Sequence, residues 1–136
     1  MTFRGLAISL VMAFSDFGCG LGSLENRIEY RVLAIVEKFS VPDSSAAGNI
    51  RVTMAGLLGR TTAYSFSEIV SQRKDTLFEF AVYGRYVEED GKSYEVRDIR
   101  FDTTLVLSLS PPRTKMHYFR IVGANGEFSD SSFVYQ

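Results

Sequence analysis

The stretch that most limits how this chain can fold runs from Leu77 to Tyr86, where apolar and aromatic residues recur at every second position. One side of the stretch carries Phe78, Phe80 and Val82, and the other side carries Glu79, Ala81 and Tyr83. A period of two places residues alternately on the two faces of a pleated strand. β-branched and aromatic residues also favour strands that pack against a second layer. We therefore predict that Leu77–Tyr86 is the central strand around which the rest of the chain packs.

Similar alternation marks several other stretches. Further strands are predicted at residues 29–41, 50–55, 94–101, 104–109, 118–122 and 133–135. In the second of these, Ile50, Val52 and Met54 share one face and mostly polar residues share the other, which predicts a half-buried strand. The first is apolar on both faces, as expected for a strand that switches between two sheets or lies under a loop.

Turn-forming residues separate most of these stretches. Asp90–Gly91, within Glu88–Lys92, and Asn125–Gly126 each predict a hairpin turn. Residues 43–49 are also predicted to form a turn. We expect Gly56 and Gly59 to bound a tight connection.

Two further features concern the later strands. The alternation slips by one residue between Val96 and Ile99, which predicts a bulge near Arg97 or Asp98. Pro111–Pro112 ends the preceding strand, because proline cannot donate a ladder hydrogen bond.

The stretch Thr61–Lys74 fits two structures. Tyr64 and Phe66 alternate as in a strand, whereas Ser65 and Glu68 have the spacing of a helix capping box. Apolar residues also fall along one helical stripe. We expect a short strand that leads into a helical turn.

Seven or eight short strands without a long helix predict an all-β chain, a two-layer antiparallel Greek-key sandwich. The domain resembles immunoglobulin-like and fibronectin-III-like folds in architecture. The antibody-type core of two cysteines around a tryptophan is excluded, since the chain has one cysteine and no tryptophan. A small β-barrel is the alternative.

Composition limits the function classes. Apolar residues make up 46% and charged residues 23%, as in an ordinary globular domain. The net charge is −1 and the basic residues are dispersed, so we expect no nucleic-acid partner. With Cys19 as the only cysteine, neither an intrachain disulfide nor a four-cysteine zinc site can form. We expect no metal and no cofactor.

The first residues have the layout of a secretory signal. Arg4 gives a positive start, and Leu6–Phe14 is an apolar run too short to span a bilayer. The run leads to Gly18–Cys19, and here the chain resembles a bacterial lipoprotein signal peptide, in which a small residue precedes a lipidated cysteine. Asp16 and Phe17 depart from that pattern, which has an aliphatic residue at the position of Asp16.

This resemblance implies a domain plan and a location. Residues 1–18 would be the signal peptide, residues 19–24 the lipidated cysteine and a flexible tether, and residues 25–136 the β-sandwich domain. Acyl chains such as palmitate on Cys19 would anchor the protein to a membrane of the cell envelope. Gly20 stands where an aspartate would mark inner-membrane retention, which favours the outer membrane. The alternative is a buried N-terminal strand with an incidental cysteine.

Candidate catalytic residues are few. His117 is the only histidine, and no serine lies in a Gly-x-Ser-x-Gly elbow, so we interpret His117 as a partly buried or edge side chain. Asp98 and Asp102 flank Arg100, and acid–base chemistry there would need a surrounding cleft. Glu88–Asp90 is interpreted as a solvated hairpin tip, since its spacing is not that of a calcium-binding loop.

Tyrosines offer a candidate binding surface. The residues concerned are Tyr83, Tyr86, Tyr94, Tyr118 and Tyr135. A sheet face that carries several tyrosines could bind a glycan or a protein strand. Cross-strand packing of the rings is the structural alternative, and it is favoured.

From these observations we expect a non-enzymatic cell-envelope lipoprotein whose sandwich has a structural or binding role. The alternatives are a glycan- or protein-recognition module, which would use end loops or the tyrosine-bearing face, and a small hydrolase built on His117, Asp98 or Asp102.

Overall fold

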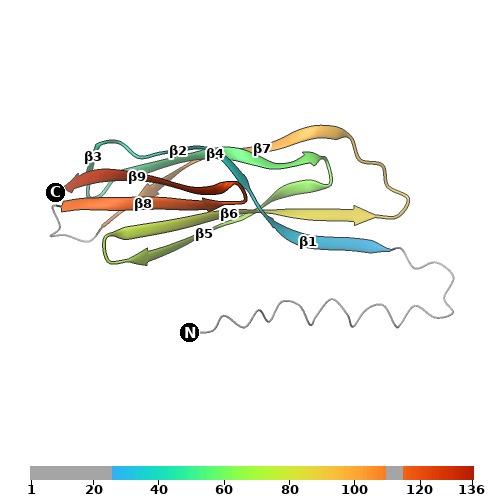
Figure 1. Ribbon diagram of the computed structural model, residues 1–136, viewed down its shortest axis with the longest axis horizontal. Helices are drawn as coiled ribbons and strands as arrows, with labels where there is room; N and C mark the ends of the chain where they lie inside the picture. Colours follow the sequence, from blue (N-terminus) through green and yellow to red (C-terminus); the bar gives the residue numbers. More distant parts are fainter. Residues whose placement is uncertain (1–25, 110–114) are drawn as a thin grey trace.

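The computed structural model describes residues 26–109 and 115–136 of the chain, and this part consists of nine strands in two sheets (Figure 1). The strands are β1 (Arg27–Leu33), β2 (Ile35–Ser40), β3 (Ser44–Ala46), β4 (Ile50–Thr61), β5 (Tyr64–Lys74), β6 (Leu77–Glu89), β7 (Val96–Leu107), β8 (Lys115–Gly123) and β9 (Gly126–Tyr135). The sheets are separate layers, so the domain is a β-sandwich, as predicted, and not the alternative closed barrel.

β6 is the centre of the six-stranded sheet. β5 pairs along one of its edges. The other edge is shared, because β8 pairs with Leu77–Ala81 and β1 with Tyr83–Glu89. β9 and then β3 continue the sheet beyond β8. The prediction that Leu77–Tyr86 is the central strand is confirmed.

β2, β4 and β7 form the second sheet, and β1 runs almost directly into β2. The change of sheet occurs at Ala34, whose backbone N–H donates to the carbonyl of Val82 on β6 over 2.9 Å. Its carbonyl accepts from the backbone N–H of Ala124 at the β8–β9 turn, also over 2.9 Å. The prediction of a strand that switches sheets is therefore confirmed.

The core lies between the two sheets. Its largest fully buried side chains include Phe80, Phe119, Ile50, Met54 and Ile121. Each such side chain stabilises the fold by about 2 kcal/mol through burial. Ile50, Val52 and Met54 are buried on β4 while Arg51 is exposed, so the half-buried strand at residues 50–55 is confirmed.

β5 is a strand along its whole length, so the helical turn expected after Thr61 is wrong. Ten register pairs join β5 to β6, with an irregularity between Phe66 and Glu68. The neighbouring edge of β6 supplies backbone partners along the strand, and this long-range pairing outweighs the local capping-box spacing.

The glycines of β4 do not end the strand, contrary to the prediction. β4 continues through both positions. Each position is a glycine because a side chain would not fit there. A Cβ at Gly56 would overlap the backbone of Ile35, and a Cβ at Gly59 would overlap the ring of Tyr64. These glycines allow close packing.

Two connections and one strand pair also differ from expectation. Residues 43–49 contain the short strand β3, which pairs in parallel with β9. Asp90–Gly91 forms a turn with Gly91 at φ 81°, but it leads from the six-stranded to the three-stranded sheet and is not a hairpin. A second parallel pair joins β6 and β8, so the sandwich is not purely antiparallel.

Two local predictions are confirmed. β8 and β9 form the predicted hairpin, but its turn is Ala124–Asn125, with Gly123 opposite Gly126, one residue earlier than the predicted Asn125–Gly126. β7 has a register irregularity between Val96 and Ile99. Pro111–Pro112 and the predicted signal with Cys19 lie outside the described residues.

Candidate binding surface

The predicted tyrosines do not form one surface. Tyr83 and Tyr86 are three residues apart on β6, so they lie on opposite faces of the sheet. Tyr83 is on the outer face, where the guanidinium carbon of Arg31 lies 3.5 Å from the centroid of its ring. Tyr83 is thus half-covered by a neighbour from β1.

Tyr86 belongs to a packed aromatic cluster on the inner face. Its ring stacks on that of Tyr30 with centroids 4.7 Å apart, and it meets Tyr64 edge-on at 4.8 Å. Its hydroxyl donates to the carboxylate of Glu88. This hydrogen bond, with some burial and the nearby negative charge, raises the pKa of Tyr86 to about 12. The favoured interpretation, cross-strand packing, describes Tyr86 well.

Tyr94 has a structural contact in the β6–β7 connection. Its hydroxyl accepts a hydrogen bond from the backbone N–H of Glu89 over 2.9 Å. The side chain therefore fixes the connection where the chain changes sheets.

Tyr118 is an exposed member of the predicted set, and it lies in an apolar neighbourhood. It projects from the outer face of β8 with 53% of its surface exposed, and Leu77 is its partner on β6. Met116 lies two residues before it and faces Phe133 on β9; each is 42% exposed. Tyr135 continues this face along β9. We call these five residues the end patch: Leu77, Met116, Tyr118, Phe133 and Tyr135.

Sequence reasoning missed Met116, Phe133 and Leu77. Met116 is two residues from Tyr118 and Phe133 is two residues from Tyr135, so alternation along each strand was a usable signal for these two. Their proximity, however, depends on the registers of β6, β8 and β9, and these are not readable from one sequence. Surface patches rich in aromatic residues and methionine are typical of protein interfaces.

An ion-pair row bounds the end patch on the same face. Arg120 on β8 binds the carboxylate of Glu79 on β6, and Glu127 on β9 lies 3.8 Å from its guanidinium. The hydrogen bond from Arg120 holds the pKa of Glu79 below its usual value, against the effect of its partial burial. These charged side chains already have partners within the chain, whereas the apolar side chains of the end patch are exposed to water.

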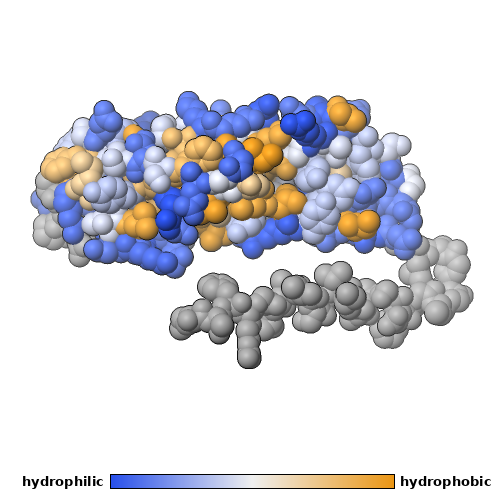
Figure 2. All heavy atoms as spheres, viewed as in Figure 1, coloured by the Kyte–Doolittle hydropathy of each residue, from blue (hydrophilic) through white to orange (hydrophobic). Residues whose placement is uncertain are grey.

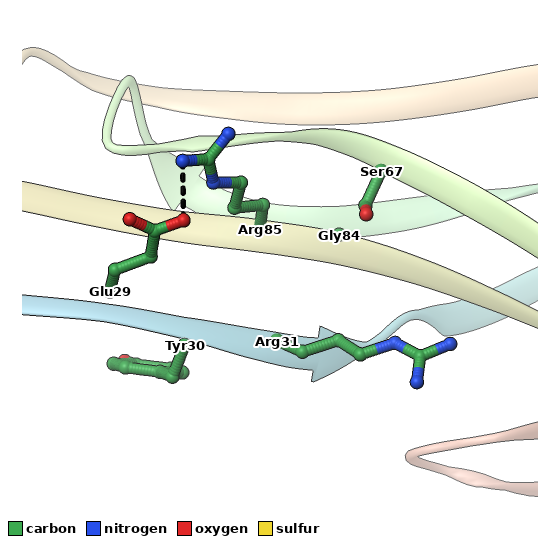
Figure 3. A pocket seen from close by; sticks show the side chains of 6 residues that line it. All are labelled: Glu29, Tyr30, Arg31, Ser67, Gly84 and Arg85. Carbon is green, nitrogen blue, oxygen red and sulfur yellow. Dashed lines mark ion pairs between the residues drawn. The ribbon is translucent and has the colours of Figure 1, made fainter. Parts of the chain in front are cut away.

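A shallow pocket of about 220 Å³ lies at the other end of the outer face (Figure 3). Its lining includes Arg31 and Arg85, which are direct neighbours in the β1–β6 register. Glu29 pairs with Arg85, as Figure 3 shows, and Arg31 lies 2.6 Å from Glu68. Because each arginine already has a carboxylate partner, the pocket does not present a pair of open cationic groups to an anion.

A larger groove of about 400 Å³ lies where β1 leaves the six-stranded sheet. It is lined by Val32, Leu33, Ile35, Leu57, Leu58, Gly59, Arg60, Thr61, Tyr64 and Ala124. In Figure 2, apolar surface gathers over the middle of the face, around the place where β1 passes into β2 in Figure 1. The lining contains neither a carboxylate nor a histidine, so the groove lacks an acid–base pair.

The candidate catalytic residues are not brought together. His117 is fully buried in the core, not partly buried or at an edge as predicted, and its Nδ1 lies 3.0 Å from the carbonyl of Lys115. Asp98 and Asp102 are exposed on β7 in the other sheet, and Arg100 pairs with Asp98 and with Glu37. This arrangement gives the hydrolase alternative no support.

The Glu88–Asp90 tip is used in contacts within the chain. Glu88 accepts from Tyr86, and Glu89 pairs with Arg27 at 3.6 Å.

Across residues 26–109 and 115–136, no group of three or more His, Cys, Asp or Glu side chains could hold a metal ion. In the same part of the chain, no helix is long and apolar enough to cross a membrane.

Comparison of the chain with protein-family models, with curated proteins and with solved structures finds no match.

Proposed function

We propose that this chain is a non-enzymatic, lipid-anchored protein of the cell envelope, and that its β-sandwich binds a protein partner through the end patch. The observation that carries the anchor is the order of features along the sequence. A charged start, an apolar run and Gly18–Cys19 precede a domain whose first strand begins at Arg27. That order is typical of a secretory signal followed by a lipidated cysteine.

The end patch supports a binding role. Met116, Tyr118 and Phe133 lie side by side and are exposed to water. Their burial in an interface would lower the free energy, and exposed apolar patches of this kind often mark binding sites. The surrounding ionisable side chains are largely engaged in surface ion pairs, which favours binding over acid–base catalysis. Methionine and leucine beside the aromatic rings favour a protein surface as the ligand.

The anchor is tested by intact-mass analysis of the protein purified from its native membrane fraction. We expect the mass of residues 19–136 plus acyl groups, and we expect Cys19→Ser to leave an unprocessed chain without those groups. An unlipidated chain that begins at Met1 in the soluble fraction would overturn the anchor. Since Gly20 follows Cys19, we also expect the lipidated protein in the outer-membrane fraction.

The binding role is tested with a photo-crosslinking residue at Phe133 and, as a control, at Val106, which is exposed on the three-stranded sheet. We expect a discrete crosslinked partner from position 133 and none from position 106. Equal products from both positions, or none from 133, would remove the end patch from the proposal.

Glycan binding is the second candidate, and it is favoured by two exposed tyrosines, Tyr118 and Tyr135, on the same side of the sheet. Rings exposed in this way can stack on sugar faces. Titration with cell-wall glycan fragments, followed by tyrosine fluorescence, should then give a saturable change that Tyr118→Ala abolishes. A flat titration would exclude it.

A further inference from the structure

The two flanks of the sandwich differ in how their edge strands are protected. On the β2 flank, side chains from the β8–β9 hairpin bind the backbone of the edge. The amide of Asn125 pairs with the N–H and the carbonyl of Val36, and Asp130 accepts from the N–H of Val41 over 2.8 Å. These groups take the place of a neighbouring strand, so this edge is covered.

The opposite flank carries two strands with a single neighbour each. Among the described residues, β5 pairs with β6 alone and β7 pairs with β4 alone. β7 has alternating charges and a register irregularity, features that discourage a foreign strand. β5 has eleven residues, contains neither glycine nor proline, and is regular from Glu68 to Lys74.

β5 therefore has an edge suited to strand addition. All of its residues except Tyr64 and Ile69 are exposed, and Val70 is an exposed apolar residue at its centre. An exposed edge offers a row of backbone donors and acceptors to another extended chain. The charges of the strand decide which chain fits that edge best.

We propose that β5 pairs in antiparallel fashion with β5 of a second copy of this chain, with Ser71 opposite Ser71 on a twofold axis. In this register Glu68 lies opposite Lys74 of the second copy, and the symmetry repeats the pair. Glu68 and Lys74 share the outer face, because they lie opposite Tyr83 and Leu77 of β6. Val70 then faces Gln72, and no like charges are opposed.

Neighbouring registers lack this complementarity. An axis at Val70 places Glu68 opposite Gln72, and an axis at Arg73 places two arginines opposite each other. Only the axis at Ser71 joins the acidic start of the regular segment to its basic end. The paired strands would merge two six-stranded sheets into one continuous sheet.

A cysteine on the axis tests the register directly. Directly opposed Cα atoms in an antiparallel pair are about 4.5–5.5 Å apart, a separation that a disulfide bridges. In the full-length chain under mild oxidant, we expect Ser71→Cys to give a disulfide-linked dimer on a non-reducing gel. The wild-type chain controls for any crosslink through Cys19.

Ser65→Cys is the matched control, since Ser65 is exposed on the same strand. Its two copies would be about 40 Å apart in the proposed register, so no link is expected. Absence of the Ser71→Cys dimer in a folded chain, or an equally strong link through Ser65→Cys, would overturn the proposal.

A charge exchange tests the interface in a second way. With Lys74→Glu, the new carboxylate at position 74 of one copy lies opposite Glu68 of the other copy, at both ends of the regular segment. We expect this repulsion to abolish the Ser71→Cys crosslink. Adding Glu68→Lys restores opposite charges and should restore the crosslink. Failure of the exchange to restore it would contradict this register. The inference does not depend on the lipid anchor, because the proposed pairing involves only residues of β5. Cys19→Ser tests the anchor separately.

Discussion

The side-chain amide of Asn125 forms hydrogen bonds with both backbone polar groups of Val36, as a neighbouring strand would. The N–H of Val36 donates to Oδ1 of Asn125 over 2.9 Å, and Nδ2 of Asn125 donates to the carbonyl of Val36 over 2.8 Å. The two residues are 89 positions apart; Val36 lies in the three-stranded sheet, and Asn125 lies in the turn between two strands of the six-stranded sheet. This pair therefore joins the β8–β9 hairpin to the place where the chain has just changed sheets.

Asn125→Ala should destabilise the domain by about 2 kcal/mol, because it leaves two polar groups of a residue that is only 2% exposed without partners. The measurement is urea unfolding followed by circular dichroism. Asn49→Ala is the matched control, since Asn49 is exposed in the β3–β4 turn, and it should change the free energy of unfolding little. Equal effects of the two substitutions would mean that the amide pair contributes nothing.

Gly59→Ala should also destabilise, because the added methyl group would overlap the ring of Tyr64. Overpacking of this kind costs about 1–3 kcal/mol. Gly48→Ala is the control, since a Cβ at Gly48 meets nothing within 4 Å. In a Tyr64→Ala background the cost of Gly59→Ala should shrink. A cost unchanged by removal of the ring would show that Tyr64 is not what excludes the methyl group.

The sequence was sufficient where a pattern had one structural solution. The alternation of Phe78, Phe80 and Val82 has the period of a strand only, and those residues are buried as predicted. The two-faced apolar stretch that became β1 and β2 also indicated its change of sheet. Such patterns report burial, and burial decides the layers of a sandwich.

The rest depended on long-range pairing. The stretch Tyr64–Lys74 fits both a helical stripe and a strand, and pairing with β6 decides between them. The end patch depends on registers that bring Met116 to Phe133 and Leu77 to Tyr118. By contrast, the separation of Tyr83 from Tyr86 was predictable from their odd spacing on one strand.

Asp75 begins the two-residue turn between β5 and β6 and has φ 54°, a conformation that L side chains rarely adopt. Asp75→Val should cost about 1–2 kcal/mol, because a β-branched residue is strained there, whereas Asp75→Asn should be nearly neutral. Thermal unfolding of the two variants compares them at the same position. A valine variant as stable as the asparagine variant would contradict the strained turn.

The hydrogen bond from Tyr86 to Glu88 predicts how stability changes in alkali. The pKa of Tyr86 rises from 10.0 to about 12 in the folded chain, so the folded state keeps a proton that the unfolded state loses between these values. The free energy of unfolding should therefore fall as the pH rises through that window. The pKa of Tyr30 is also raised, first of all by burial, so phenolate absorbance should show more than one tyrosine that titrates late, and Tyr86→Phe should remove the component near 12.

Glu88→Gln separates this contact from the other tyrosines. It removes the negative charge that opposes ionisation, so the pKa of Tyr86 should move back toward 10.0 and the alkaline loss of stability should become smaller. Glu95→Gln, also exposed in this region, is the control and should leave the late titration in place. If Glu88→Gln leaves the late-titrating phenolate unchanged, the carboxylate is not its cause, and burial against Tyr30 and Tyr64 would have to account for it.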